Sequence, residues 1–362
     1  MPKFDGDDDG AAARLSSPRS YTLSLNPQII YAQSAFLRSL VSSQIHTQLE
    51  FLAVGSWWIL RDGRLHKIPS TREDVFNDDS LSMRDKRGLM KFLRHVLQEE
   101  EADETTTDQS EQQSLQTALA TKFNVPESLQ AALLALALAP TPARATSFKD
   151  ALSRIQRHVR SIGYFGPGFG SVVAKYGGNA EIAQAACRAG AVGGAVYLLG
   201  HGIDSVETFA PAESGPPDDT PEPALSITLS NQTQIRSRFV VGGPDDLPRS
   251  SLDTESCERM VSASTLRSIT VVSDPLPQLF PPTSENGPVP AVAIVLLEPQ
   301  ASDAEERPPI YLQVHSEETG ECPTHQCEFL MSFNVVSCMM IRTSNTYLHC
   351  LRRFSAVLKS IL

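Results

Sequence analysis

Two neighbouring stretches decide how this chain folds, IPSTREDVFN (residues 68–77) and DKRGLMKFLRHVL (residues 85–97). In the second stretch, the apolar residues recur with the i, i+3, i+4, i+7, i+8 spacing of a helix that buries one face in a protein core. These core-facing residues are Leu89, Phe92, Leu93, Val96 and Leu97. The two stretches therefore predict the entry into a packed helical block.

Phe76 and Arg87 are the candidate binding residues of these stretches. The polar run NDDS (residues 77–80) can cap the next helix, so the ring of Phe76 can project from a loop instead of joining the apolar stripe. An exposed aromatic ring with an arginine nearby is what a protein-binding hot spot requires. Without further information the residues favour another interpretation, in which Phe76 packs under the preceding hairpin and Arg87 is a solvated helix residue.

Outside these stretches the chain alternates between helical and strand patterns. Asn26-Pro27 is typical of a helix start, and Asp62-Gly63 predicts a tight hairpin turn. Helices are predicted over residues 27–41, 89–97, 115–123, 127–139 and 147–162, and a helix and turn over residues 180–199. Strands are predicted over residues 49–54, 57–60, 65–68, 226–230, 238–241, 266–272, 291–297 and 310–314. The fold class is α+β, with a helical block inserted into a sheet-bearing domain.

The run LLALAL (residues 133–138) is apolar on nearly every face, so its helix must be buried. Two interpretations remain: a central core helix, or the wall of a cavity that receives something long and apolar. Composition alone favours the core. The acidic run at residues 99–104, with the polar tract up to residue 114, is typical of a solvated linker rather than an acidic binding surface.

Residues 163–178 are rich in glycine, which suggests a phosphate-binding loop. Neither the G-x-G-x-x-G pattern of dinucleotide sites nor the G-x-x-x-x-G-K-[ST] pattern of P-loops occurs there. We therefore predict a hinge between lobes and no nucleotide cofactor.

Composition limits the classes of partner. The net charge of −11 argues against a nucleic-acid surface, which needs clustered Lys and Arg, and favours a basic partner. No stretch approaches the length of a membrane span, and the acidic start DGDDDG (residues 5–10) is no signal peptide. We expect a soluble cytosolic chain whose 41% hydrophobic residues suffice for a core. Reduced thiols are expected at Cys187, Cys257, Cys322, Cys327, Cys338 and Cys350.

One cysteine segment suggests a metal. CPTHQC (residues 322–327) places three soft or borderline ligands close together, and His349 with Cys350 could in principle complete a tetrahedron. The spacing fits no common zinc module. A turn between strands is the favoured interpretation, and we predict no metal.

The two opening stretches resemble the part of the Rab escort proteins through which the escort grips Rab geranylgeranyltransferase. The related Rab GDP-dissociation inhibitors keep the Pro-Ser-Thr and Glu-Lys-Arg-like parts but lack the aromatic anchor, so the resemblance favours an escort over an inhibitor. It implies that Phe76 and Arg87 bind the transferase. It also implies a sheet domain that is a relict of a dinucleotide-binding fold.

A second resemblance lies further along the chain. AEIAQAACR (residues 180–188) is similar to the Gly-Glu-Leu-Pro-Gln-Gly-Phe-x-Arg segment of the same superfamily, and residues 191–199 are similar to the segment after it. In that family the segment builds the platform that contacts the switch regions of Rab. The resemblance assigns to this platform Glu181, Gln184, Arg188, Val196 and Leu198. Without it, Glu181 and Arg188 would be a surface charge pair on one helical face.

The sequence also departs from the family. Members open with a strand, a G-x-G-x-x-G-like turn, a helix and a further Rab-contacting segment, none of which is present, so we expect a shortened chain. Ala183 and Ala185 stand where the family usually has Pro and Gly. The likeness covers residues 19–203 and thins beyond Pro244.

The expected domains follow from these patterns. Residues 1–18 are an acidic disordered start, residues 19–75 and 164–328 form an incomplete sheet domain, and residues 76–163 form a helical domain with a flexible linker at 99–114. Residues 329–362 are an unassigned tail.

The resemblance implies a non-catalytic Rab escort protein, without a cofactor of its own. Such a protein binds GDP-bound Rab GTPases, presents them to the Rab geranylgeranyltransferase heterodimer and shelters the attached geranylgeranyl groups. The groove for these groups is predicted at Leu133, Leu134, Leu136 and Leu138. The protein is expected in the cytoplasm, with transient membrane contact. The alternatives are a Rab GDP-dissociation inhibitor, a flavin or nicotinamide oxidoreductase of related fold, and a truncated non-functional product.

Overall fold

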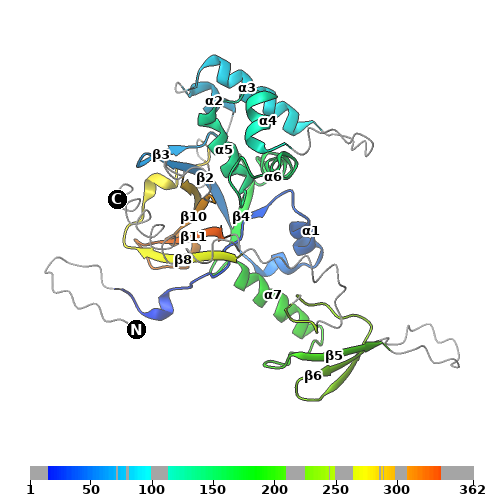
Figure 1. Ribbon diagram of the computed structural model, residues 1–362. Helices are drawn as coiled ribbons and strands as arrows, with labels where there is room; N and C mark the ends of the chain where they lie inside the picture. The colour runs from blue at the N-terminus through cyan, green and yellow to red at the C-terminus, as the bar shows by residue number, and fades with distance from the viewer. Residues whose placement is uncertain are drawn as a thin grey trace. The chain divides into compact units, whose positions relative to one another are not determined.

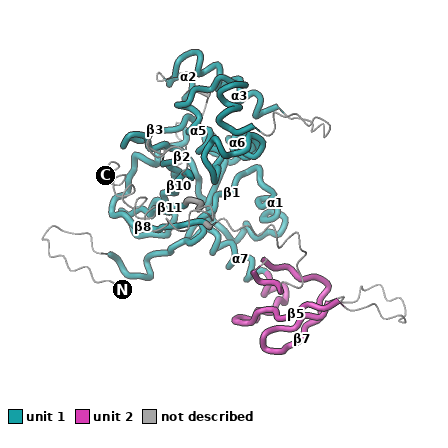
Figure 2. The backbone as a smooth tube through the Cα atoms, viewed as in Figure 1, with its two compact units in different colours: residues 1–189, 264–362 teal, residues 190–263 magenta. Residues whose placement is uncertain are grey.

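A computed structural model describes residues 15–70, 72–78, 81–98, 113–208, 225–243, 245–248, 264–284, 287, 289–297 and 308–335 (Figure 1). The chain divides into two compact units (Figure 2). The first unit contains residues 1–189 and 264–362, and the second contains residues 190–263. Every predicted site except Val196 and Leu198 falls in the first unit.

The first unit is built on a mixed sheet. Its described strands are β1 (Ile30–Tyr31), β2 (Phe51–Arg61), β3 (Arg64–Lys67), β4 (Ser171–Ala174), β8 (Ser264–Val272), β9 (Val292–Leu297), β10 (Ile310–Ser316) and β11 (Cys327–Val335). Their order is β1-β4-β2-β9-β10-β11-β8, and β3 pairs with β2. Only the β2–β9 pairing is parallel among these strands. β9 is buried along its whole length, as expected for an apolar strand covered on both faces.

The hairpin between β2 and β3 confirms the predicted turn. Asp62 and Gly63 both have positive φ angles, 50° and 73°, and they connect the antiparallel pair Arg61 and Arg64. Two successive left-handed residues are the signature of the turn that matches the twist of adjoining strands.

Helices of the first unit surround the sheet and form the inserted block. They are α1 (Ala35–Ser42), α2 (Arg72–Asn77), α3 (Met83–Leu97), α4 (Leu115–Thr121), α5 (Glu127–Ala137), α6 (Phe148–Ser161) and α7 (Asn179–Val192). α2 to α6 lie between β3 and β4 in the chain and share one apolar core, which includes Phe92, Leu119 and Ile155. The predicted α+β fold with an inserted helical block is confirmed.

α5 joins the helical block to the sheet. Leu133 and Leu134 pack in the core of the block, whereas Ala135 packs against the sheet with Ile294 and Leu296. The hydroxyl of Tyr311 in β10 lies 2.9 Å from the carbonyl of Ala139 and 3.2 Å from that of Leu134, so it donates to the end of this helix.

Three predicted elements are wrong. No helix begins at Asn26-Pro27, because Ile30 and Tyr31 pair with β4 instead, and α1 starts only after Ser34, whose hydroxyl accepts from the Leu37 amide. The glycine-rich segment is not a plain hinge, since it contains the buried strand β4. A Cβ on Gly170 would come within 2.3 Å of the Ser161 backbone, so close packing accounts for one of these glycines. Residues 238–241 form no strand.

The predicted domain boundaries differ from the observed elements at several points. The helical block starts at Arg72, before residue 76, and β11 continues to Val335, past residue 328. Residues 190–263 form a unit of their own rather than part of the sheet domain. Residues 1–14 of the acidic start and 99–112 of the linker lie outside the described residues.

The second unit contains a small antiparallel sheet. Its described strands are β5 (Ile203–Thr208), β6 (Leu225–Leu229) and β7 (Gln234–Ser237), with β6 in the centre. The segment that precedes β5 is exposed from Ala191 to Gly200.

Replacing Ser82 with alanine is expected to lower the free energy of unfolding by about 1 kcal/mol. The Ser82 hydroxyl accepts from the Asp85 amide at the start of α3, and the Asp85 carboxylate accepts from the Ser82 amide in return. Urea unfolding measures the change. Ser39→Ala is the control, because that hydroxyl only donates to a carbonyl of its own helix; an equal loss there would contradict the capping argument.

Candidate functional site

The predicted transferase-binding residues lie on one hollow of the helical block. Phe76 is 68% exposed, and the hollow beside it has a volume of about 360 Å³. Phe76 belongs to the short helix α2 and not to a loop, so the predicted loop is wrong although the predicted exposure is correct. The lining residues are Val75, Phe76, Met83, Lys86, Arg87, Met90, Lys91 and Arg94. The structure thus brings Phe76 and Arg87 together.

Local contacts hold Phe76 in this position. The Ser70 amide and hydroxyl donate to the Asp74 carboxylate at 3.0 and 3.1 Å, which ties the preceding segment to α2. The Lys86 ammonium of α3 donates to the Phe76 carbonyl at 2.8 Å, which ties the end of α2 to α3. Both contacts hold the backbone that presents the exposed ring.

The hollow combines apolar and positively charged side chains. Met83 is 63% exposed, and Met90 also lines the hollow. Lys86, Arg87, Lys91 and Arg94 make the lining strongly basic although the whole chain carries a net charge of −11. A surface of this kind suits a partner that inserts apolar side chains and surrounds them with carboxylates.

The predicted Rab-binding platform is distributed over both units. Glu181, Gln184 and Arg188 lie on α7, where the Gln184 amide donates to the Glu181 carboxylate at 3.4 Å. Gln184 and Arg188 are exposed and Glu181 is half-buried. Val196 and Leu198 are exposed in the second unit, at 82% and 49%. The roles of these residues stay predictions.

The predicted lipid groove is packed. Leu133 and Leu134 are buried in the core of the helical block, Leu138 packs against the sheet, and Leu136 contacts both cores. This is the arrangement of a central core helix, the interpretation that composition favours. A groove at these leucines would require α5 to separate from its neighbours, so this role stays a prediction.

The cysteine segment forms a turn whose thiols stay protonated. Burial raises the pKa of both Cys322 and Cys327 to about 12, and their sulfurs donate to the carbonyls of Gln326 and Pro275. Among the described residues no three His, Cys, Asp or Glu side chains converge on a possible metal position. His349 and Cys350 lie outside the described residues.

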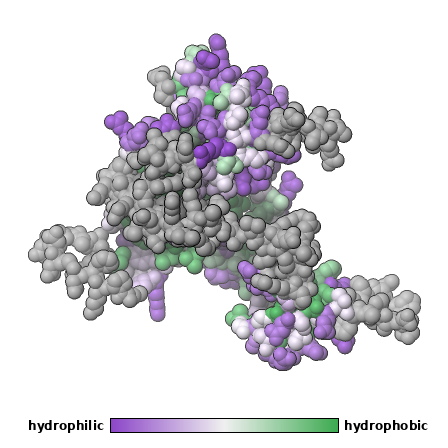
Figure 3. All heavy atoms as spheres, viewed as in Figure 1, coloured by the Kyte–Doolittle hydropathy of each residue, from purple (hydrophilic) through white to green (hydrophobic). Residues whose placement is uncertain are grey.

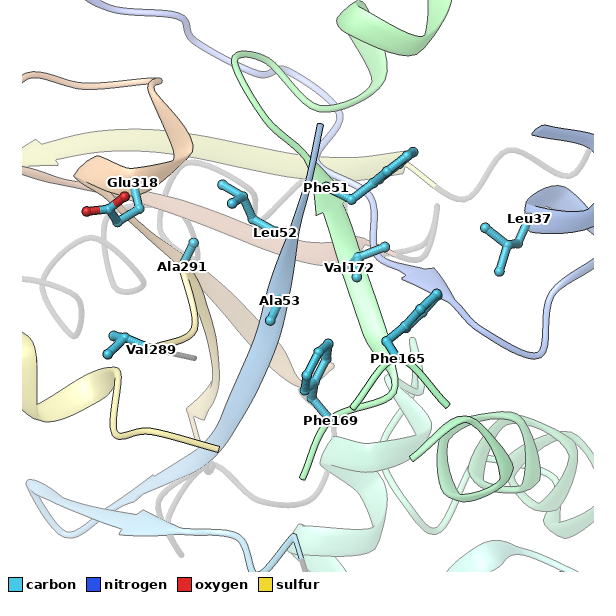
Figure 4. Close-up of a pocket in the computed structure, with 10 residues that line it drawn as sticks. All are labelled: Leu37, Phe51, Leu52, Ala53, Phe165, Phe169, Val172, Val289, Ala291 and Glu318. Carbon is cyan, nitrogen blue, oxygen red and sulfur yellow. The ribbon is translucent and has the colours of Figure 1, made fainter. Parts of the chain in front are cut away.

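Two features were not predicted from the sequence. One is an apolar pocket of about 740 Å³ in the first unit, lined by residues from Leu37 to Glu318 (Figure 4). The other is a buried group of ionisable side chains around Glu328. Residues far apart in the chain meet in the pocket, so no spacing pattern in the sequence predicts it. The sequence signal for the buried ionisable group was Glu328, an isolated glutamate inside the apolar run CEFLM (residues 327–331).

The surface of the helical block is mainly hydrophilic. On the face shown in Figure 3, hydrophilic residues cover most of the helical block, because its apolar side chains face the core. None of the helices in the described part of the chain is long and apolar enough to span a bilayer.

Comparison with known proteins gives the family. Residues 2–322 match the sequence profile of the family described as GDP dissociation inhibitor. The chain belongs to the GDP dissociation inhibitor family. The Rab GDI of Plasmodium falciparum has the same fold, with a TM-score of 0.62, 16% identity, and coverage of 94% of this chain and 73% of that one. An oxidoreductase from Methanosarcina mazei, at 9% identity and a TM-score of 0.58, shares the fold alone.

Curated relatives are named as Rab geranylgeranyltransferase component A or as Rab escort protein. The "Rab proteins geranylgeranyltransferase component A" of Saccharomyces cerevisiae is 33% identical over 183 residues, which are 51% of this chain and 30% of that protein. The human "component A 2" is 30% identical over 186 residues, 51% of this chain and 27% of that protein. The "Rab escort protein 1" of Arabidopsis thaliana is 24% identical over 189 residues, 48% of this chain and 34% of that protein. The matches thus span about a third of the length of these relatives.

Proposed function

We propose that this chain is a Rab escort component, which binds GDP-bound Rab GTPases and presents them to Rab geranylgeranyltransferase. The observation that carries the proposal is the exposed Phe76 ring beside Arg87, at the place where the escort resemblance assigns transferase binding. The names of the curated relatives support it.

In this proposal the hollow beside Phe76 is the transferase-binding surface. The ring enters an apolar pocket of the transferase, and the methionines around it exclude water from the contact. The basic rim made by Lys86, Arg87, Lys91 and Arg94 pairs with carboxylates of the partner and speeds their encounter. The chain itself performs no chemistry and holds no cofactor.

The Rab side of the proposal rests on α7. Its exposed polar face carries Gln184 and Arg188, with Glu181 one turn earlier. Charged groups on one helical face can recognise a polar switch surface through charge-assisted hydrogen bonds. Val196 and Leu198 add apolar contact from the second unit. The protein works in the cytoplasm and contacts membranes transiently when cargo is delivered.

The test is a titration of the purified chain against the Rab geranylgeranyltransferase heterodimer, with prenyl diphosphate present. Saturable binding that weakens with rising salt supports the escort assignment, because the basic rim of the hollow is screened by ions. A folded chain that does not bind the transferase contradicts it. Binding to prenylated Rab in the absence of transferase binding would favour a GDP-dissociation inhibitor, the function that the family name describes.

Replacing Arg188 with alanine is expected to weaken binding to Rab about tenfold while leaving transferase binding unchanged. Arg188 is exposed on α7, so its removal leaves no buried charge unpaired. Fluorescence titration with GDP-loaded Rab measures the effect. The exposed Arg38 of α1 supplies a matched control as Arg38→Ala. A loss of both partners in the Arg188 variant would indicate misfolding and contradict the assigned role.

A further inference from the structure

A buried group of ionisable side chains lies where β10 turns into β11. Glu328 is fully buried in β11, and His315 stands opposite it on β10. His315 is hydrogen-bonded through Nδ1 to the carboxyl of Glu321, which belongs to the turn and is 2% exposed. The two carboxyls lie close enough for the charge of Glu321 to act on Glu328. Glu328, Glu321 and His315 together form the carboxyl cluster.

The carboxyl cluster lacks the hydrogen bonds that would hold two buried carboxylates. Neither oxygen of Glu328 has a hydrogen-bond partner among the described residues, and Oε1 of Glu321 has none there either. A buried carboxylate without partners is costly, and two such charges repel each other. Burial, with the charge of Glu321 as a smaller cause, raises the pKa of the Glu328 carboxyl to about 8. The cluster is therefore most stable with a proton on Glu328.

The elements around the carboxyl cluster carry further ionisable groups of both signs. They are Glu317 and Cys322 of the turn, Cys327 of β11, Arg267 of β8, Asp274 after β8, and Lys175 and Tyr176 after β4. The β8 residue directly opposite Glu328 is Val271. Lys175 pairs with Glu50 at 3.0 Å, and Arg267 donates to a backbone carbonyl. Both cations are thus directed at other groups, so ionisation of Glu328 is not compensated by them.

The turn that contains Glu321 is bonded to the segment from which α7 starts. The Tyr176 amide donates to the Thr319 carbonyl at 2.8 Å, and the Thr22 amide donates to the Glu321 carbonyl at 2.8 Å. A Cβ on Gly320 would come within 2.6 Å of the Tyr176 ring, so the turn packs closely against this segment. α7 begins three residues after Tyr176. A movement of the turn is therefore transmitted to the first turn of α7.

We propose that the carboxyl cluster is a proton-operated latch for the start of α7. With a proton on the cluster, the turn keeps its shape and its backbone bonds to Tyr176 and Thr22. Release of the proton to solvent leaves an uncompensated charge beside Glu321, which pushes the turn outward and loosens both bonds. The inference rests on the proposed escort function in one respect, because α7 is its Rab-binding helix. The latch therefore lowers the affinity for Rab as the pH rises.

Amide hydrogen exchange of the full chain at pH 6 and pH 8.5 tests the latch itself. After correction for the intrinsic pH dependence of exchange, the amides of Thr22 and Tyr176 are expected to open about tenfold or more as often at pH 8.5, because Glu328 loses its proton over this range. The internal reference is the Asp85 amide, which donates to the Ser82 hydroxyl at the exposed end of α3 and should not respond. Unchanged opening at Thr22 and Tyr176 would overturn the inference.

Glu328→Gln and Glu328→Met both make the cluster position neutral at every pH. Each should abolish the faster opening at pH 8.5, and the methionine variant tests this without a buried amide. Glu318→Gln is the matched control, because Glu318 is exposed in the same turn, and it should open as the unmodified chain does. Circular dichroism confirms that each variant is folded. Faster opening that persists in the Glu328 variants would overturn the latch.

Titration with GDP-loaded Rab at the same two pH values tests what the latch controls. The unmodified chain is expected to bind about threefold or more weakly at pH 8.5 than at pH 6, and Glu328→Gln should not share this loss. Groups of Rab itself titrate equally against both chains, so an equal pH dependence of the two chains would overturn the control of α7. The expected exchange behaviour without Rab binding at either pH would contradict the proposed Rab-binding role and leave the latch intact.

Discussion

Replacing Phe76 with alanine is expected to weaken binding to Rab geranylgeranyltransferase about 30-fold or more and to leave Rab binding unchanged. A hot-spot aromatic residue contributes ~2 kcal/mol or more on truncation, which corresponds to this factor. The ring is 68% exposed in the free chain, so its loss removes little from the folded state. Isothermal titration with the transferase heterodimer measures the affinity, and GDP-loaded Rab is titrated in parallel.

A matched ring elsewhere provides the control for this experiment. Tyr164 is 67% exposed in the same unit and does not line the hollow beside Phe76, so Tyr164→Ala should leave transferase affinity unchanged. Arg87→Gln should weaken the affinity less than Phe76→Ala and should reduce its salt dependence. Unchanged binding by Phe76→Ala would remove the main structural argument for an escort.

The local features of the fold were predictable because local spacing determines them. The stripe from Leu89 to Leu97 has the helical period, and α3 covers it from Met83 to Leu97. Asp62-Gly63 needs only its own backbone preferences to make the turn. The exposure of Phe76 was not predictable from local spacing, because the residues alone favour a packed ring and only the escort resemblance favours an exposed one.

The failures share a different cause. Ile30 and Tyr31 have helical spacing with later residues, yet they pair with Val172 and Ser171 far along the chain, and this tertiary contact overrides the pattern. β11 was missed because Glu328, Ser332 and Asn334 interrupt its apolar residues. The pocket beside β2 joins Leu37 to Glu318 through the fold alone, so the sequence contains no local signal for it.

The Glu328 carboxyl is completely buried in β11, and neither of its oxygens has a hydrogen-bond partner in the described structure. His315 lies directly opposite it on β10 and is hydrogen-bonded through Nδ1 to the Glu321 carboxyl. The charge of Glu328 also acts on the Cys322 thiol, together with the charges of Glu321 and Glu317. Burial, with the charge of Glu321 as a smaller cause, raises the pKa of Glu328 from 4.5 to about 8.

The raised pKa gives the stability of the protein a defined pH dependence. The protonated Glu328 carboxyl contributes its full share below about pH 4.5, and this share is lost as the pH rises through about 8. Between pH 5.5 and pH 8.5 the free energy of unfolding should therefore fall by roughly 3 kcal/mol through this group.

Glu328→Gln is expected to remove that fall, because the amide does not ionise. Urea unfolding of both proteins at pH 5.5, 7 and 8.5 measures the difference in slope, which is independent of any constant cost of burying the amide. Glu318→Gln is the control, since Glu318 is exposed in the same hairpin and should leave the slope unchanged. Equal slopes for the unmodified protein and Glu328→Gln would show that the Glu328 carboxylate is stabilised by a partner, contrary to the buried and unpaired state described for it.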